Sequence, residues 1–450
     1  MSGRFDGERA VVVGAGVAGL GAARALVAEG ADVVVSEERA LRGEAVADEL
    51  AALGIALRDG GHDPTHLDDA TLVVVGPGVR PDAPVVAWAR ERALPVWGEL
   101  ELGARLATAP YLAVTGTNGK TTVTSMIESC LRTDGRDALA CGNIGRSFPQ
   151  AARERHDVLV VEASSFQLVM QESFHPVVSV LLNVATDHLD WHGDDDAYRA
   201  AKERIHAAQR GDDVHVGNRD DPVAAELSAR ARCRVRWFRR GAPAEDEVGY
   251  EDGELVARTD GIAHRLGPIP GERAGYREDA AAAAAAALAY GAAPEAAAAA
   301  LADFQPAPHR GEVVATIGGV RFVDNSKATN PHAAAAAIDG AGDAVLIAGG
   351  RAKGVDLSPL RAHAARLRAV IAIGEAATDV VATFDGVVPT SVAGSIDEAV
   401  REAFGAAEPG DTVLLAPACA SWDQFRNYAE RGDRFAAAAR SLREEAGARG

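Results

Sequence analysis

Short apolar runs, rich in β-branched residues, recur along the chain and end at glycine or at a small polar residue. A segment with helix-like composition follows most of these runs. Runs of this kind are typical of strands buried in a parallel sheet that alternates with helices. The pattern therefore predicts an α/β fold. The expected strands are Val11–Val13, Val33–Val35, Val73–Val75, Leu112–Val114, Val158–Val161, Val177–Leu182, Val345–Ala348, Val370–Ile373 and Val413–Leu415.

Two interruptions of this pattern divide the chain into thirds. The first lies around Leu94–Gly103, just before a new strand and a glycine loop. The second, between Asp303 and Gly311, contains two prolines and follows an alanine-rich segment, 280–302, that predicts a helix. A chain of 450 residues has room for three domains at about 150 residues each. We expect domains at 1–98, 99–306 and 307–450, with small hairpins in the polar stretch Arg239–Asp260.

The composition is that of a soluble globular protein, with 48% hydrophobic and 25% charged residues. The chain has 46 Lys and Arg against 65 Asp and Glu, a formal net charge of −19. This acidic surplus argues against a protein that coats nucleic acid or an anionic membrane. An anionic ligand would have to be held by backbone amides and a few local cations.

Four scattered cysteines, none in a CxxC pair, argue against a disulfide scaffold and a cysteine zinc site, and they fit a reducing cytosol. The opening residues, MSGRFDGERA, carry no signal-peptide pattern. The alanine-rich segment Ala280–Pro294 is too short and too weakly apolar to span a bilayer. We therefore expect a cytoplasmic protein.

A glycine loop, Gly14–Gly19, lies between the first expected strand and a helix-like segment. Glycines at such a turn let a phosphate approach the helix amides. Glu37 and Glu38 follow the next strand, where a ribose-binding carboxylate would lie. By itself this pattern suits a nicotinamide or flavin dehydrogenase about as well as a tight turn without a ligand.

A second glycine loop, Thr115–Thr122 (TGTNGKTT), follows the strand Leu112–Val114 and opens a helix. Its amides and Lys120 suit a phosphate chain, and its hydroxyls suit magnesium. The loop departs from the strict GxxxxGK[ST] pattern, because Val114 stands six positions before Lys120. Glu162 ends a later strand, where an acid can hold the magnesium of a nucleotide. The alternative for that segment is a helix cap made by the following serines, Ser164 and Ser165.

Further polar clusters follow other expected strands. Asn183–His192 could ligate a metal or move protons, although its HLDWH spacing lacks the HExxH arrangement of zinc sites. Lys202 lies in a helical segment, and its residue type alone predicts a solvated lysine. The clusters Asp324–Asn330 and Ala418–Phe425 lie where open sheets bind ligands, or they cap helices.

Taken together and in this order, eight blocks between about residues 111 and 425 resemble the Mur ligases of bacterial cell-wall synthesis. The blocks are TGTNGKTT, GNIG, VEASSFQL, NVATDHLD, YRAAK, PHRGE, NSKATN and APACASWDQF. Three of them, SSFQL, NSKATN and ACASxDQF, look like the D-glutamate-adding branch of that family.

The resemblance implies a three-domain fold and an activity. The N-terminal domain would be Rossmann-like and bind the UDP part of a substrate, without hydride chemistry. The central P-loop-type α/β domain would bind ATP, and a Rossmann-like C-terminal domain would bring the amino acid. The implied reaction joins UDP-N-acetylmuramoyl-L-alanine to D-glutamate through an acyl phosphate, with ADP and phosphate released, in cytoplasmic peptidoglycan synthesis. The implied cofactors are ATP, magnesium and a carbamylated Lys202, in a monomer without nucleic-acid or membrane partners.

The resemblance also implies site residues, which group by ligand. The catalytic residues would be Lys120, Glu162, His188 and Lys202, and the metal ligands Thr121, Glu162, His188 and Lys202. Contacts to ATP would come from Gly116, Thr117, Asn118, Gly119, Lys120, Thr121, Thr122, Asp279, His309, Arg310, Asn325 and Lys327. The UDP substrate would contact Gly14, Val17, Ala18, Ser36, Glu37, Gly76, Pro77, Gly78 and Asn143. D-glutamate would contact Thr329, Lys353, Ser421, Trp422 and Phe425.

The chain departs from the family pattern at three places. Asp279 stands where the family has an Asn near the adenine, and an acid accepts hydrogen bonds but does not donate them as an amide does. Asp324-Asn325 replaces the usual Asn-Asp order, and Ser36-Glu37 replaces the expected Asp. Three alternatives to the D-glutamate ligase stay open: another Mur-type or folylpolyglutamate-type ligase, an NAD(P)-dependent reductase that uses Gly14–Gly19, and a nucleotide-binding regulatory module without turnover.

Overall fold

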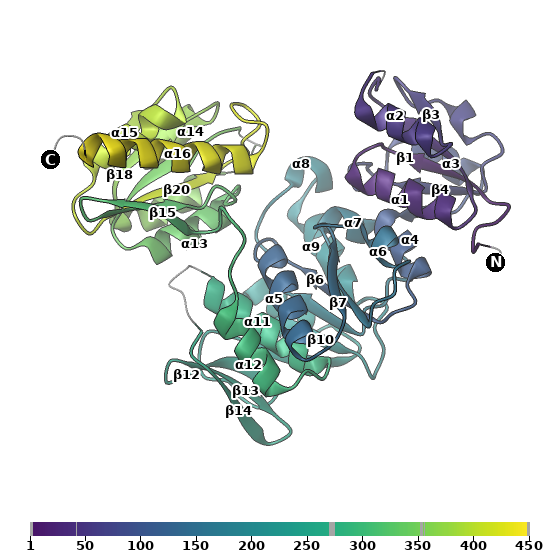
Figure 1. The fold of residues 1–450 in the computed structure, drawn as a ribbon, viewed down its shortest axis with the longest axis horizontal. Coiled ribbons are helices and arrows are strands. Elements are labelled where there is room, and N and C mark those ends of the chain that lie inside the picture. Colours follow the sequence, from purple (N-terminus) through teal and green to yellow (C-terminus); the bar gives the residue numbers. More distant parts are fainter. Residues whose placement is uncertain (1–2, 42, 270–274, 352–353, 355, 448–450) are drawn as a thin grey trace. The chain divides into compact units, whose positions relative to one another are not determined.

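The computed structural model describes residues 3–41, 43–269, 275–351, 354 and 356–447 (Figure 1). Within these residues the strands form three sheets, of five, nine and six strands. The chain divides into two compact units. The first unit, which holds the first two sheets, is Met1–Val184, Asp194–Ile269 and Glu278–Phe304, and the second, which holds the third sheet, is Ala185–Gly193, Pro270–Arg277 and Gln305–Gly450.

The N-terminal sheet is parallel, with the strand order β3-β2-β1-β4-β5. Its central strand is buried on both faces: Val11 and Val13 pack on one side, and Ala10 and Val12 on the other. This arrangement explains why the strand is a continuous apolar run. The elements are β1 (Arg9–Val13), α1 (Val17–Ala28), β2 (Asp32–Glu37), α2 (Ala45–Ala52), β3 (Ala56–Asp59), η1 (Pro64–Leu67), β4 (Leu72–Val75), α3 (Pro84–Glu91) and β5 (Val96–Gly98).

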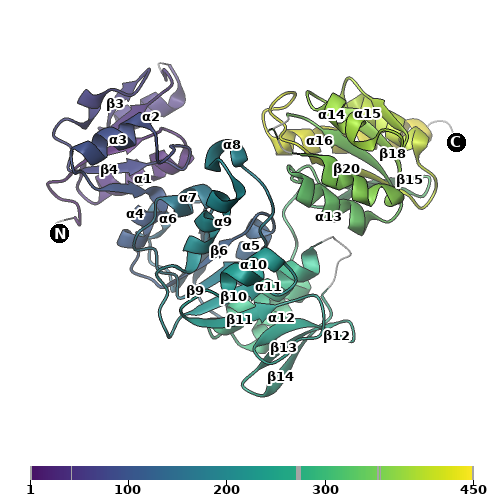
Figure 2. The same cartoon turned by 180° about the vertical axis from the view of Figure 1, so that it is seen from behind.

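The central sheet has the order β14-β13-β12-β11-β10-β9-β6-β8-β7, parallel from β7 to β12 and antiparallel from β12 to β14. Figure 2 shows β9, β10 and β11 side by side. Its elements begin with α4 (Glu99–Leu106), β6 (Tyr111–Thr115), α5 (Lys120–Thr133), β7 (Ala138–Gly142), α6 (Phe148–Ala151), β8 (Val158–Glu162), α7 (Ser165–Val169) and β9 (Val178–Leu181). They continue with α9 (Asp195–Glu203), η2 (Arg204–His206), β10 (Val214–Asn218), α10 (Pro222–Ser228), β11 (Arg234–Phe238), β12 (Glu247–Glu251), β13 (Glu254–Thr259) and β14 (Ile262–Gly267).

The alanine-rich segment forms two helices, α11 (Tyr276–Ala289) and α12 (Pro294–Asp303), so the single helix predicted over 280–302 is wrong. The break has a local cause. Gly291 adopts a left-handed φ of 92°, and Pro294, which has no N–H to donate, begins the second helix. The hairpins expected in Arg239–Asp260 are confirmed by β12 and β13, and β14 extends them to Gly267.

A buried polar network lies beneath the central sheet and sets a pH response. His215 Nε2 lies 2.9 Å from Ser228 Oγ, and Nδ1 lies 2.6 Å from Ser179 Oγ. Because Ser179 donates its hydroxyl hydrogen to Gln209, Nδ1 is the nitrogen that carries the proton of a neutral imidazole. Burial holds the pKa of His215 well below its usual range, and burial also lowers the pKa of His206, whose ring lies 4.6 Å away between centroids.

We expect acid to destabilise the central domain through these two histidines. In the unfolded chain both imidazoles take up protons near pH 6.5, whereas in the folded chain they do so only at lower pH, so stability falls as the pH drops below 6.5. Each buried histidine contributes up to about 1.4 kcal/mol per pH unit below 6.5. Urea unfolding midpoints at pH 7.5 and 5.5 measure how steeply the free energy of unfolding falls with pH. The variant His215→Asn should show a shallower slope than the parent, and an unchanged slope would contradict this assignment.

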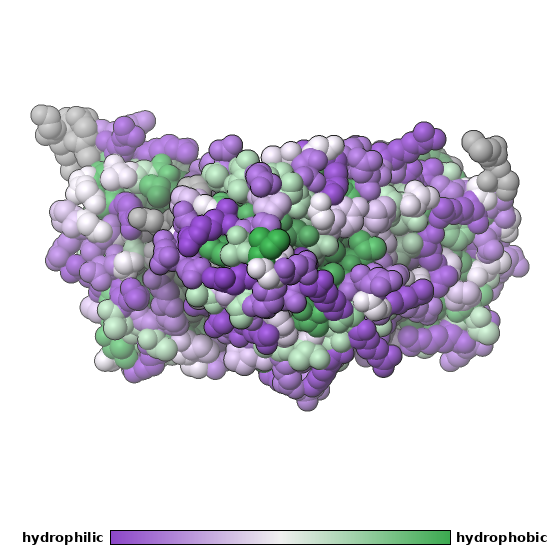
Figure 3. All heavy atoms as spheres, turned by 90° about the horizontal axis from the view of Figure 1, so that it is seen from below, coloured by the Kyte–Doolittle hydropathy of each residue, from purple (hydrophilic) through white to green (hydrophobic). Residues whose placement is uncertain are grey.

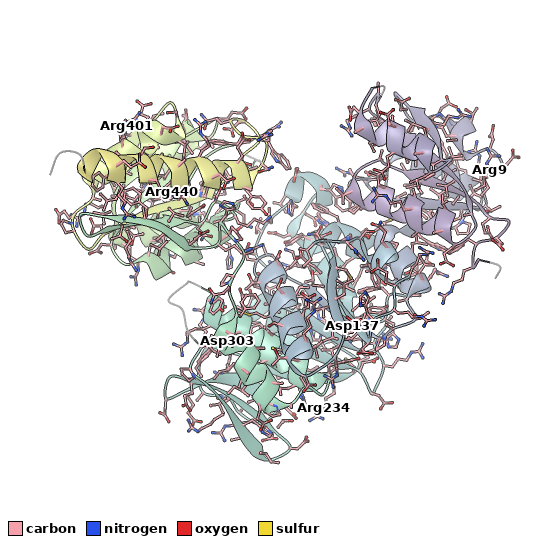
Figure 4. All side chains as sticks on the ribbon, viewed as in Figure 1. Arg9, Asp137, Arg234, Asp303, Arg401 and Arg440 are labelled. Carbon is pink, nitrogen blue, oxygen red and sulfur yellow. The ribbon has the colours of Figure 1, made fainter. Side chains whose placement is uncertain are left out.

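The third sheet has the order β15-β16-β20-β17-β18-β19 and is parallel except for the β15–β16 pair. The exposed Arg401 and Arg440 belong to α15 and α16, two helices that carry charged side chains on their outer faces (Figure 4). The elements of this unit are α8 (Leu189–His192), β15 (Glu312–Ile317), β16 (Val320–Asp324), α13 (Pro331–Ala341), β17 (Ala344–Gly349), η3 (Ser358–Arg366), β18 (Leu367–Ile373), α14 (Ala377–Phe384), β19 (Thr390–Val392), α15 (Ile396–Ala406), β20 (Thr412–Ala418) and α16 (Tyr428–Gly447).

The predicted α/β class is confirmed, and each of the predicted apolar runs coincides with a strand. The face drawn in Figure 3 is mainly hydrophilic, with hydrophobic residues in small groups. In the part of the chain that the structure describes, no helix combines the length and the apolar character needed to cross a bilayer. The domain boundaries near residues 98 and 306 stay predictions.

Candidate functional site

The loop between β6 and α5 is folded around its own lysine. Lys120 Nζ donates to the carbonyl oxygens of Gly116 and Thr117, each at 2.9 Å. The loop is pinned to the end of β9: Asn183 Oδ1 accepts from Asn118 N at 2.8 Å, and Asn183 O accepts from Thr117 N at 2.9 Å. This geometry holds a cation over a turn at the start of a fourteen-residue helix, as phosphate binding requires.

Gly119 precedes this helix with a left-handed φ of 86°. A Cβ atom there would overlap the carboxylate of Asp279, so only glycine fits, and Asp279 lies directly beside the loop. Of the other predicted ATP contacts on this loop, Thr121 is half-buried and Thr122 is buried.

Glu162 ends β8, the strand beside β6, and pairs in register with Val114. Its side chain is only 2% exposed. Glu162 Oε1 accepts from the side-chain Nδ2 of Asn143 at 2.8 Å, and the backbone N–H of Asn143 donates to Glu162 O at 2.9 Å. Oε2 is buried and has no hydrogen-bond partner among the described residues. An open carboxylate oxygen in this place fits a metal cation, because a buried anionic oxygen needs a compensating partner.

The segment after Glu162 is a helix cap, which confirms that alternative, and the magnesium role of Glu162 stays a prediction. Ser164 Oγ accepts from Gln167 N at 3.3 Å, and Gln167 Oε1 accepts from Ser164 N at 2.9 Å, which forms a capping box for α7. Gln167 Nε2 in turn donates to Glu99 Oε2 at 2.7 Å. Glu99 was missed by the sequence analysis, and no motif marks it.

Lys202 is buried, with 1% of its surface exposed, so the solvated lysine predicted from its residue type is wrong. Its Nζ donates to Gly116 O at 2.7 Å and lies 4.6 Å from the centroid of the Tyr198 ring. The Tyr198 hydroxyl is 3.0 Å from Thr117 Oγ1. Tyr198 and Lys202, four residues apart, share the face of α9 that packs on the phosphate loop. Lys120 and Lys202 therefore donate to one and the same carbonyl oxygen.

The loop after β1 is closed by its glycines. Gly14 has a left-handed φ of 97°, and a Cβ atom on Gly19 would overlap Gly14 O. Gly76 N donates to Val13 O at 2.9 Å, which brings the Gly76–Gly78 loop after β4 beside it. The two predicted UDP-binding loops thus lie at the carboxyl ends of neighbouring strands. Val17 is exposed, and Ala18 is half-buried.

Ser36 and Glu37, the candidates for a base contact, both have partners inside the domain. Glu37 Oε2 accepts from Ala15 N at 2.7 Å and Oε1 from Arg39 N at 3.0 Å. Burial alone would raise the Glu37 pKa, but these two amides and the Arg39 guanidinium outweigh burial and lower the pKa. Ser36 Oγ lies 2.8 and 2.9 Å from the Nδ1 atoms of two histidines, His62 and His66.

In the second unit, His309 and Lys327 lie near one another. His309 Nδ1 is 2.7 Å from Asp324 Oδ2, and Lys327 N donates to His309 O at 3.2 Å. Burial raises the Asp324 pKa, although His309 opposes that shift. Lys327 Nζ lies 3.9 Å from the centroid of the Tyr428 ring. The other predicted ATP contacts of this unit, Arg310 and Asn325, are half-buried.

Four of the five predicted D-glutamate residues, Thr329, Ser421, Trp422 and Phe425, lie on two adjoining segments, since Ala418 N donates to Ala328 O at 2.9 Å. The loops are joined by residues that the sequence analysis missed: the fully buried Arg431 donates to Ser326 O at 2.9 Å and to Cys419 O at 3.2 Å. Burial lowers the Arg431 pKa to about 10. Of the predicted residues, Ser421 is buried, Thr329 is half-buried, Phe425 packs on the core, Trp422 is 65% exposed, and Lys353 lies outside the described residues.

His188 begins α8 in a left-handed conformation, and its Nε2 lies 3.6 Å from Asp187 Oδ2. Asp187 Oδ2 also accepts from Asn330 Nδ2 at 3.1 Å. His188 belongs to the second unit, whereas Thr121, Glu162 and Lys202 belong to the first. No group of three or more His, Cys, Asp or Glu side chains among the described residues could hold a metal.

Family models and individual relatives agree on the family. The models described as "Mur ligase MurD-like, N-terminal domain", "Mur ligase middle domain" and "Mur ligase, glutamate ligase domain" match residues 8–98, 114–273 and 309–419. A UDP-N-acetylmuramoylalanine–D-glutamate ligase of Acidobacterium capsulatum is 43% identical over 96% of both chains. The ligase of the same name from Frankia casuarinae is 45% identical over 97% of this chain and 95% of its own.

Solved structures show the same three-domain fold at low sequence identity. The UDP-N-acetylmuramate-alanine ligase MurC of Thermotoga maritima covers 96% of this chain and 99% of its own, with a TM-score of 0.59 and 18% identity. The MurF ligase of Thermotoga maritima in complex with ADP covers 92% and 95%, with a TM-score of 0.60 and 16% identity. The family models and the full-length relatives replace the dehydrogenase interpretation of the first glycine loop and the regulatory-module alternative. The chain belongs to the Mur ligase family.

Proposed function

We propose that this protein joins D-glutamate to UDP-N-acetylmuramoyl-L-alanine and converts ATP to ADP and phosphate, a cytoplasmic step of peptidoglycan synthesis. The observation that carries the proposal is the pairing, on adjacent strands, of a lysine-bearing phosphate loop with the open oxygen of Glu162. Two full-length relatives above 40% identity, both named UDP-N-acetylmuramoylalanine–D-glutamate ligase, support this substrate pair over other amino acids.

The reaction needs two steps, because a carboxylate does not expel its own oxygen. First, a carboxylate oxygen of the L-alanine end attacks the γ-phosphorus, the bond to the β–γ bridging oxygen breaks, and ADP leaves. The acyl phosphate then accepts the D-glutamate amine at its carbonyl carbon. The tetrahedral intermediate collapses to the amide, phosphate leaves with the bonding electrons, and the amine loses a proton. Two anions meet in the first step, so positive charge matters most there.

The residues of the central domain suit that need. We assign the β- and γ-phosphates to Lys120 and the amides of its loop. Thr121 and Glu162 would hold magnesium, which neutralises phosphate charge and aligns the γ-phosphate for attack. Asn143, held against Glu162, would meet the diphosphate of the UDP substrate. Asp279, beside Gly119, would lie close to the nucleotide.

The N-terminal loops Gly14–Gly19 and Gly76–Gly78 would hold the UDP part, with Val17 and Ala18 on the substrate side. Ser36 and Glu37 are buried and bind neighbouring side chains and amides, so we propose that they support the UDP-binding loops and that one of the two meets the base. In the C-terminal third, we assign nucleotide contacts to His309, Arg310, Asn325 and Lys327, and D-glutamate contacts to Thr329, Lys353, Ser421, Trp422 and Phe425.

We propose that Lys202 acts as a carbamate. Two ammonium groups that donate to the single carbonyl oxygen of Gly116 repel one another inside the protein. Reaction of the neutral Lys202 amine with CO₂, with loss of one proton, removes that repulsion and creates a carboxylate-like group. The carbamate nitrogen keeps one N–H for Gly116 O, and its two oxygens would become available to magnesium. His188 stays a proposed metal ligand of the second unit.

An amino-acid panel tests the proposed function. Phosphate release from ATP is expected only when UDP-N-acetylmuramoyl-L-alanine and D-glutamate are both present. Turnover with L-lysine or meso-diaminopimelate instead of D-glutamate would refute the specificity. We also propose a cytoplasmic monomer, for which light scattering should give a mass near 46.6 kDa.

A further inference from the structure

Glu99 is a buried carboxylate that the reaction described above does not use. It is the first residue of α4 and is 1% exposed. Oε1 accepts from Phe148 N at 3.1 Å, and Oε2 accepts from Gln167 Nε2 at 2.7 Å. Both donors are neutral, and no basic side chain of the described residues forms an ion pair with it. Burial raises the Glu99 pKa to about 7, so this acid is retained against an electrostatic cost.

The hydrogen bond between Glu99 and Gln167 decides the orientation of the Gln167 side-chain amide. Oε1 of Glu99 already accepts from the Phe148 N–H, so Oε2 is the atom that meets Gln167; as an acceptor it binds the NH₂ end of the Gln167 amide and turns the oxygen end away. That oxygen, Gln167 Oε1, accepts from both Ser164 N and Ser164 Oγ, each at 2.9 Å. If the amide were reversed, an NH₂ group would face the Ser164 amide and the capping box would be lost.

The Ser164 turn directly follows Glu162. Between them, Ala163 N donates to Val114 O at 2.9 Å, and Thr115 Oγ1 donates to Ala163 O at 2.8 Å. The backbone after Glu162 is therefore held by β6 on one side and by the Gln167 cap on the other. The hydrogen-bond chain Glu99–Gln167–Ser164 ends two residues after Glu162, whose Oε2 is left open.

We propose that Glu99 is a positioning residue, which fixes the amide orientation of Gln167 and through the Ser164 turn the direction in which Glu162 presents its open oxygen. This role rests on the proposed function, in which Glu162 binds magnesium. Glu99 itself touches neither substrate nor metal.

Glu101 provides a matched control. It lies on the same helix and is equally buried, but it accepts from Glu172 N and Ser173 N, each at 2.8 Å, and binds Arg105. No residue of the phosphate loop or of the Glu162 turn is among these partners. Glu101→Gln makes the same substitution on the same helix without removing a partner of Gln167.

Calorimetric titration and steady-state kinetics with Glu99→Gln test the proposal. Glu99→Gln is expected to weaken binding of MgADP about tenfold while metal-free ADP binds as in the parent. The magnesium concentration for half-maximal turnover should rise, and kcat should fall, with KM for D-glutamate unchanged. Glu101→Gln should leave the magnesium dependence at the parent value. MgADP affinity equal to that of the parent in Glu99→Gln would overturn the proposal.

A double-variant cycle separates positioning from general loosening. Gln167→Ala should reproduce the loss of MgADP affinity, and Glu99→Gln should add nothing further in that background. If the losses of MgADP affinity in the two single variants multiply in the double variant, Glu99 acts by another route, and the proposal is overturned. If Glu99→Gln does not fold, Gln167→Ala alone decides. MgADP affinity equal to that of the parent in Gln167→Ala would refute the hydrogen-bond chain from Glu99 to Ser164. Absence of D-glutamate-dependent turnover in the parent would instead refute the proposed function. The MgADP and ADP titrations would still test the positioning role of Glu99 in that case.

Discussion

Lys120→Ala is expected to lower kcat for D-glutamate ligation about a thousandfold, because the variant removes the loop cation that we assign to the phosphates. Lys120 is half-buried, and its Nζ donates to the carbonyl oxygens of Gly116 and Thr117, so the side chain lies along its own loop and not in the hydrophobic core. Thermal unfolding should therefore change far less than activity. Phosphate release at saturating substrates measures the effect.

The opposite end of the same helix offers the control. Arg132 is also basic, and its Nε donates to Ala138 O at 2.8 Å, at the end of α5 away from the loop. Arg132→Ala should cost some stability and leave kcat within about twofold, since surface substitutions of this kind have small effects. If Lys120→Ala keeps kcat within tenfold of the parent, Lys120 does not stabilise the transferring phosphate.

Lys202→Ala is expected to lower kcat at least about a hundredfold, because it removes a group that we place on the magnesium and that tunes its site. A short carboxylate such as formate or acetate should restore part of the activity of Lys202→Ala, since it fits the vacated space and replaces the carbamate oxygens. The rescue should depend on the carboxylate concentration and should be absent with chloride at equal ionic strength.

A substitution that keeps the positive charge distinguishes a carbamate from a cation at this position. Lys202→Arg retains a positive charge but cannot form the carbamate, so we expect it to be as inactive as Lys202→Ala. Arg199→Ala, three residues earlier on α9, serves as the control and should retain parent-like activity. Near-normal activity of Lys202→Ala, or full activity of Lys202→Arg, would remove the carbamate from the mechanism.

The sequence was most informative where local chemistry dictates structure. Buried strands such as Val11–Val13 and Val73–Val75 must be continuous apolar runs, because both of their faces are covered. The glycine loops were recognisable for a related reason: Gly119 needs a left-handed backbone, and Gly19 must leave room for a neighbouring carbonyl. The Gly291 and Pro294 break was also written in the sequence, and the single-helix prediction overlooked it.

Buried charged residues were not recognisable in the same way. Lys202, Glu99 and Arg431 look like ordinary surface residues in the sequence, because their burial depends on partners far along the chain. The hydrogen-bond partner of Lys202, Gly116, lies 86 positions away in the sequence. Gln167 lies 68 positions from Glu99, and Ser326 lies 105 positions from Arg431. No local pattern encodes such separations, and the assignment of site roles still rests on the tests above.

By itself the sequence determined the alternation of strands and helices, the two kinds of glycine loop and the family resemblance, since these depend on residue types at short spacing. The tertiary structure alone decided which charges are buried and what faces them. It joined Lys120 and Lys202 at one carbonyl oxygen, left one oxygen of Glu162 open, and tied that residue's turn to Glu99. The physical reason is that burial and hydrogen-bond pairing arise only when distant segments pack, whereas backbone propensity acts within a few residues.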